Sequence, residues 1–121
     1  MSRDFAFRVW DVENEVMVYD VGIEMMGVAY ICPPEAYEPE QMDYYPDGVV
    51  MQYTGLRDKH GERIFEGDIL RFLLPKERVI EVSWYDVEAA YIFGMLSGRY
   101  SDKEVIGNIY EKPELLKEAN D

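Results

Sequence analysis

Hydrophobic and polar positions alternate at the start of the chain. Every second side chain of residues 5–10 is large and apolar, which is typical of a β-strand. A polar, turn-prone stretch at 11–15 separates this segment from apolar residues 16–19, so the pattern predicts a β-hairpin over 5–19. Residues 20–31 are apolar but are interrupted by two glycines, and they fit either an irregular strand or a short helical turn.

The next segment, residues 32–48, differs in composition. It holds four of the six prolines and three tyrosines, together with five of the acidic residues. Proline removes a backbone donor and fixes φ, so this density disfavours a helix or a central strand. The segment is predicted to be a long acidic loop with a short helical turn near residues 40–44. Loops of this length in a compact domain are usually functional or mobile.

Strand-like patterns recur after residue 48, at spacings typical of a small barrel or sandwich. Gly61 ends a predicted turn at 58–61, and Pro113 stands at a favourable first-turn position for a short helix over 113–117. We therefore expect a mainly β protein (β-rich α+β) with a short C-terminal helix, divided into residues 1–48 and 49–121, which form either two lobes or one structural unit. The predicted strands are residues 49–53, 69–74, 79–84, 89–93 and 104–110.

The distribution of charge along the chain bears on whether the protein can bind nucleic acid. The 121 residues carry a net charge of −13, of which −9 falls on residues 1–50 and −4 on residues 51–121. Residues 11–50 hold ten acidic and no basic side chains. Such a surface repels phosphates, so broad nucleic-acid binding is disfavoured. Two alternatives remain: local binding through the basic second half, or acidic mimicry of a nucleic acid that acts on a host protein. The basic residues concerned are Arg57, Lys59, Arg63, Arg71, Lys76, Arg78, Arg99 and Lys103.

Cys32 is the only cysteine, which excludes an intrachain disulfide and a zinc site built on several cysteines. No apolar run reaches the roughly 18 residues of a membrane span, and the N-terminus lacks a secretory pattern. A cytoplasmic location without membrane contact is expected.

The most conspicuous short motif joins Glu66, Gly67 and Asp68. Two carboxylates near a glycine can bind a divalent cation, but such a site needs several converging oxygens. The favoured interpretation is structural, with Gly67 permitting a turn and Asp68 accepting backbone hydrogen bonds. His60 is interpreted as an exposed turn residue rather than a general base, and no metal or cofactor is expected.

Tyrosines provide the candidate interaction surface. Tyr37, Tyr44 and Tyr45 of the proline-rich segment are predicted to pack against a partner or a second copy of the chain. Tyr53 and Arg57 are either partner anchors or the end of a strand and its turn.

Four ordered blocks resemble the YopX-like family of small phage and prophage proteins. They are Phe7–Asp11 with Met17–Tyr19, Val50–Asp58, Ile64–Ile69, and Val105–Glu111 with Pro113–Leu116. The resemblance implies a bacterial host and a mostly β architecture whose second half is similar to an SH3-like barrel. The family has no established activity, so the resemblance implies no catalytic residues.

No nucleotide-binding, zinc-protease or serine-hydrolase motif occurs in the chain. The leading hypothesis is a non-enzymatic protein–protein interaction module of phage or prophage type. Its partner is expected to be a bacterial host protein, with self-association as a further option.

Overall fold

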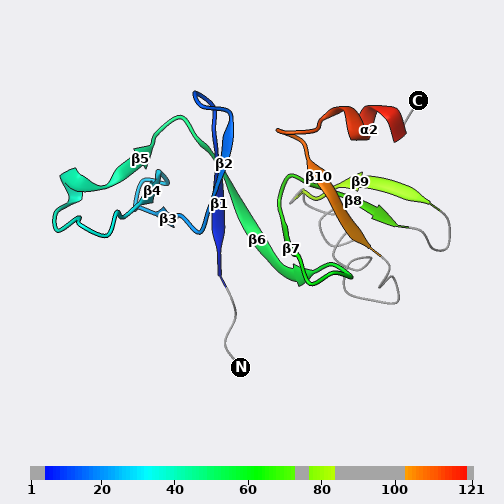
Figure 1. The fold of residues 1–121 in the computed structure, drawn as a ribbon, viewed down its shortest axis with the longest axis horizontal. Coiled ribbons are helices and arrows are strands. Elements are labelled where there is room, and N and C mark those ends of the chain that lie inside the picture. Colours follow the sequence, from blue (N-terminus) through cyan, green and yellow to red (C-terminus); the bar gives the residue numbers. More distant parts are fainter. Residues whose placement is uncertain (1–4, 73–76, 84–102, 120–121) are drawn as a thin grey trace. The chain divides into compact units, whose positions relative to one another are not determined.

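The structure is a computed structural model and describes residues 5–72, 77–83 and 103–119. These residues form antiparallel sheets, one 3₁₀ turn and a short C-terminal helix, and the curled sheets include a half-barrel (Figure 1). The predicted mainly β fold, with its N-terminal hairpin and C-terminal helix, is confirmed. The predicted strand at 89–93 lies outside the described residues, as do the last residues of the predicted strands at 69–74 and 79–84.

The chain divides into two compact units, one ending at Gln52 and the other beginning at Tyr53. This division falls inside strand β6 (Val49–Arg57), whereas the predicted boundary after residue 48 stands just before it. Strand β6 therefore belongs to both units, and no separate linker joins them.

The first unit is built around the predicted hairpin, β1 (Phe7–Asp11) and β2 (Val16–Tyr19). On its other side, β1 pairs with the first residues of β6, with Phe7 opposite Gln52 and Trp10 opposite Val49. The hairpin turn forms because the Asp11 carboxylate accepts hydrogen bonds from the Glu13 and Asn14 amides, at 3.1 and 3.3 Å.

The ambiguous segment after the hairpin forms two short strands, β3 (Gly22–Ile23) and β4 (Ala29–Ile31). The 3₁₀ turn η1 (Pro39–Gln41) matches the predicted helical turn in position to within a few residues. The structure differs from the predicted loop at β5 (Asp43–Tyr45), which pairs with β4. Strand β5 can form because it lies between Pro39 and Pro46 without containing a proline, and because it is an edge strand.

Aliphatic and aromatic side chains form the core of the first unit. Val9, Val21 and Ala29 are buried at its centre. The partly buried residues packed against them are Phe7, Val18, Ile23, Ile31, Tyr45 and Val50. Tyr45 is therefore a core residue on one side, although its sequence context predicts a loop.

The second unit contains the end of β6, β7 (Arg63–Phe65), β8 (Asp68–Phe72), β9 (Arg78–Glu81), β10 (Glu104–Asn108) and α2 (Glu114–Ala119). Strand β8 lies between β10 and β9 in one sheet, and β7 pairs with β6. Ile64, Leu70, Phe72 and Val82 are buried together and form its core. The sequence pattern does not predict strand β7, because three residues are too few to show an alternation of apolar and polar positions.

Candidate functional site

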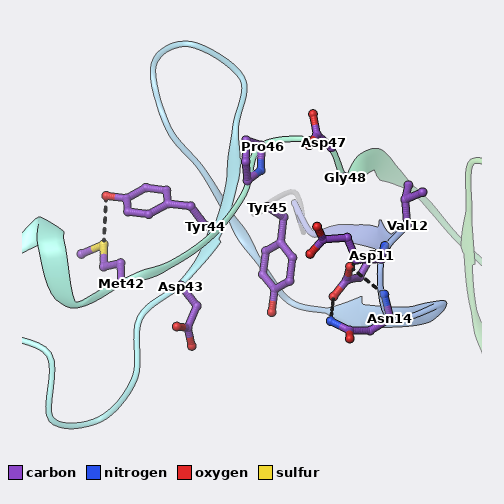
Figure 2. A pocket seen from close by; sticks show the side chains of 11 residues that line it. Asp11, Val12, Asn14, Met42, Asp43, Tyr44, Tyr45, Pro46, Asp47 and Gly48 are labelled. Atoms are coloured by element: carbon purple, nitrogen blue, oxygen red, sulfur yellow. Dashed lines mark hydrogen bonds between the residues drawn. The ribbon is translucent and has the colours of Figure 1, made fainter.

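A groove opens in the first unit between the β1–β2 turn, residues 11–14, and residues 42–48, which contain β5 (Figure 2). Its volume is about 400 Å³. Both lining segments lie before Gln52, so the groove belongs to the first unit alone. A pocket of this size accommodates a side chain or a small ligand.

One wall of the groove is aromatic. Figure 2 shows the Tyr45 ring between the side chains of Asp43 and Asp11. Tyr44, its neighbour, contacts Met42 through a 4.0 Å hydrogen bond from its hydroxyl to sulfur. The Tyr44 ring also lies 6.1 Å from that of Tyr30, so it is partly held in place.

The remaining lining is acidic. It includes Asp11, Glu13, Asp43 and Asp47, and no basic residue. The Asp11 carboxylate is fixed by a 2.8 Å hydrogen bond from the Asn14 side chain. This hydrogen bond lowers the pKa of Asp11. The carboxylate is therefore ionised and oriented at neutral pH.

The carboxylates of the groove affect the Tyr45 hydroxyl electrostatically. Burial raises the pKa of the Tyr45 hydroxyl, and the charges of Asp43 and Asp11 raise it further. The two carboxylates thus create a negative potential at the same point of the groove.

Gly48 shapes one end of the groove. A Cβ atom at this position would lie 2.4 Å from the Val9 Cγ2 atom and 3.1 Å from the Tyr45 Cβ atom. Because Val9 is fully buried, only glycine lets the chain pass this close to the core.

The structure separates the five predicted interaction residues. Tyr37 is 90% exposed and does not line the groove, whereas Tyr44, which is 43% exposed, and Tyr45 both line it. Tyr53 belongs to the second unit, is buried, and packs on Phe65 with ring centroids 5.6 Å apart. Of its two predicted roles, these contacts support the structural one.

Arg57 also contributes to local structure. Its Nη1 atom donates a 2.8 Å hydrogen bond to the Gly61 carbonyl, which closes the turn after β6. Gly61 has a φ of 82°, as expected for a residue that ends such a turn.

Glu66, Gly67 and Asp68 form the turn from β7 into β8. Gly67 has a φ of 85°, and the buried Asp68 carboxylate accepts a 2.8 Å hydrogen bond from the Phe65 amide. Within residues 5–72, 77–83 and 103–119, no group of three or more potential ligands could hold a metal ion. The contacts of Asp68 therefore support the structural interpretation of this motif.

Asp58, which the sequence did not single out, joins two distant segments of the second unit. Its Oδ1 atom accepts hydrogen bonds from the His60 and Glu62 amides, at 2.8 and 2.9 Å. Its Oδ2 atom accepts one from the Val105 amide of β10 at 3.0 Å. Burial raises the pKa of Asp58, but these backbone hydrogen bonds outweigh it and leave the pKa below its ordinary value.

Glu104 lies at the centre of a cluster of basic side chains. Arg71 donates a hydrogen bond to it, His60 Nε2 lies 3.2 Å from its carboxylate, and Lys59 Nζ lies 3.9 Å away. Hydrogen bonds from Arg71 and His60 lower the pKa of Glu104. His60 is an exposed turn residue, as predicted, with its side chain 61% exposed.

The Glu104 cluster predicts a pH dependence of stability. A carboxylate whose pKa is lower in the folded than in the unfolded state stabilises the fold above its unfolded pKa. This stabilisation is lost as the pH falls from about the ordinary value of 4.5 through the lowered pKa of folded Glu104. In urea unfolding at pH 7 and at steps down to pH 3, Glu104→Gln should lose less stability than the wild type.

The wild type must be compared with Glu104→Gln because the chain carries many other carboxylates that titrate over the same pH range. Protonation of other carboxylates relieves charge repulsion in both proteins equally, so the difference between them isolates Glu104. Parallel pH profiles for wild type and Glu104→Gln would contradict the prediction.

The groove residues Asp11, Asn14, Asp43 and Asp47 were missed as a site by sequence reasoning. The available signal was the absence of basic residues between positions 9 and 56. That signal marks the region as acidic, but it does not show that residues 11–14 and 42–48 lie together.

Comparison with known proteins identifies the family. The family model described as YopX protein matches residues 6–117. The chain is also similar to the crystal structure of protein EF1440 from Enterococcus faecalis, with a TM-score of 0.62 and 27% sequence identity. This match covers 95% of the present chain and 99% of EF1440. No curated protein matches the sequence. Since the family match spans nearly the whole chain, the protein belongs to the YopX family.

Proposed function

We propose that this protein is a non-enzymatic interaction module of phage or prophage type that binds a bacterial host protein in the cytoplasm. Residues 5–52 would carry the contact surface. One observation supports this assignment above the others: among the described residues, every exposed large hydrophobic side chain lies between positions 5 and 44. These residues are Phe5, Val12, Val16, Tyr19, Met25, Met26, Tyr37 and Tyr44.

The same surface has a uniform charge. Residues 5–52 contain ten carboxylates and a single basic residue, Arg8, which is buried at 2% exposure. Exposed apolar side chains in an anionic surface fit a partner that offers apolar pockets surrounded by Lys and Arg.

The most exposed pair, Met25 and Met26, stands at the tip of the β3–β4 turn. Both side chains are almost fully accessible, at 98% and 84%. The turn beneath them is held by hydrogen bonds between the Glu24 and Val28 backbones at 3.0 Å and from the Val28 amide to the Glu24 carboxylate at 2.8 Å. Because the turn is already ordered, binding through these adaptable side chains requires little additional ordering of the backbone.

The first functional test is affinity capture with the full-length protein. Wild type and Met25→Ser/Met26→Ser are immobilised and exposed to bacterial lysate, and retained proteins are compared by quantitative mass spectrometry. We expect a basic protein that the wild type retains and that the double variant retains about tenfold less, since two exposed anchors are lost.

Lys112→Ser/Lys117→Ser is the matched control, because both lysines are exposed and lie in the second unit. It should retain the same protein as the wild type. Identical retained sets for all three proteins would overturn the proposal. Thermal unfolding should show unchanged stability for each variant, because exposed side chains contribute little to it.

Acidic mimicry of a nucleic acid is a second candidate, favoured by the lack of any exposed cation among residues 5–52. It predicts that duplex DNA competes with this protein for the captured partner. Direct nucleic-acid binding has less support, because Arg57, Lys59 and Arg71 already make contacts within the chain. Phosphates would have to compete with the carboxylate of Glu104.

A further inference from the structure

The groove of the first unit concentrates charge that the chain does not neutralise. Among residues the structure describes, no cation pairs with Glu13, Asp43 or Asp47. The sequence has no basic residue between Arg8 and Arg57, so the lining segments cannot supply one locally. Uncompensated carboxylates around a concave site favour a cationic occupant brought by another molecule.

The shape of the groove selects the kind of cation. Its carboxylates are distributed along two segments, and they do not form a cluster that could hold a metal ion. Its volume of about 400 Å³ also exceeds what a bare ion needs. An extended side chain with a charged end can instead contact Val12 and Pro46 along its methylenes and reach the carboxylates with its head group.

The Tyr45 ring adds a preference for an organic cation. It lies on the groove wall between Asp43 and Asp11 (Figure 2). A guanidinium or ammonium group over a tyrosine face gains a cation–π interaction, which strengthens as the site loses water. Arg63 makes such a contact with a ring in this same chain, 5.1 Å from the centroid of Phe65.

We infer that the groove between residues 11–14 and 42–48 receives an arginine or lysine side chain from a basic, extended segment of the partner protein. This inference rests on the proposed function, whose contact surface it makes specific. A second copy of the chain is a poor occupant, because its net charge of −13 would bring further negative charge to an acidic groove.

The test uses a fluorescent glycine- and serine-based peptide that carries two arginines, together with a version in which both arginines are citrulline. Amide shifts in ¹⁵N spectra of the full-length protein locate the binding site, and titration gives the affinity. We expect saturable shifts at Asn14, Tyr45 and Gly48 with the arginine peptide and none with the citrulline peptide. Asp43→Asn/Asp47→Asn should weaken binding about tenfold, because two ion pairs are lost.

The matched control is Glu35→Gln/Glu38→Gln, which removes the same charge at exposed positions outside the groove. It should bind the arginine peptide nearly as well as the wild type. Equal weakening by both double variants, or shifts that avoid the groove, would overturn the inference and indicate general charge attraction.

Failure of the inference can be distinguished from failure of the proposed function. If lysate capture depends on Met25 and Met26 but not on Asp43 and Asp47, the interaction module stands and the groove is not its binding site. If capture depends on neither pair, the proposed function fails as well.

Discussion

Replacing Asp58 with alanine is expected to lower the free energy of unfolding by about 3 kcal/mol, because three backbone amides lose their acceptor together. Asp58 is only 8% exposed, so water replaces the lost carboxylate poorly. Two of the amides belong to the turn after β6, and the third belongs to Val105, 47 residues further along the chain. The substitution therefore loosens the turn and its attachment to β10 at the same time.

Urea unfolding at pH 7 measures the loss, and hydrogen exchange at the Val105 amide shows where it occurs. Asp58→Asn is the matched variant, because it keeps one carbonyl oxygen for the turn and replaces the other with a donor. It should lose less stability than Asp58→Ala while still weakening the contact to Val105. Wild-type stability and unchanged exchange in Asp58→Ala would contradict this assignment.

Replacing Phe72 with alanine is expected to have a comparable or larger effect, a loss of about 3–5 kcal/mol. Phe72 is 1% exposed and packs with Ile64, Leu70 and Val82 in the core of the second unit. The substitution removes a buried ring and leaves a cavity that the surrounding strands can fill only partly.

Tyr37→Ala serves as the control for Phe72→Ala, since it truncates a similar side chain at a position that is 90% exposed. Thermal unfolding should show a large decrease in midpoint for Phe72→Ala and almost none for Tyr37→Ala. Equal decreases in the two variants would contradict the burial of Phe72. In the lysate-capture experiment we expect the opposite ranking, with Tyr37→Ala retaining less of the partner protein than Phe72→Ala.

Much of the fold could be predicted from local pattern. Strand β2 has the predicted bounds, and α2 begins one residue after the Pro113 that indicated it. Both are elements whose period, turn chemistry or first-turn residue is local in the sequence. The family was predicted from four ordered blocks, and the match over residues 6–117 confirms it.

The candidate site could be predicted only in part. Tyr44 and Tyr45 were singled out as surface residues, but their strand was missed because the surrounding prolines indicated a loop. The pairing of β1 with β6 joins residues about 40 positions apart, and β4 pairs with β5 across the proline-rich segment. Neither pairing leaves a local signal, so the groove that depends on them could not be inferred.

Strand β6 has a consequence for how such a protein can change during evolution. Its first residues pair with β1 and its last residues pair with β7, so a single strand supplies backbone hydrogen-bond partners in both units. A recombination break within residues 49–57 would leave one half without its edge partner and expose unsatisfied backbone groups. The two halves are therefore expected to be inherited and exchanged together, even where the acidic first half adapts to a different partner.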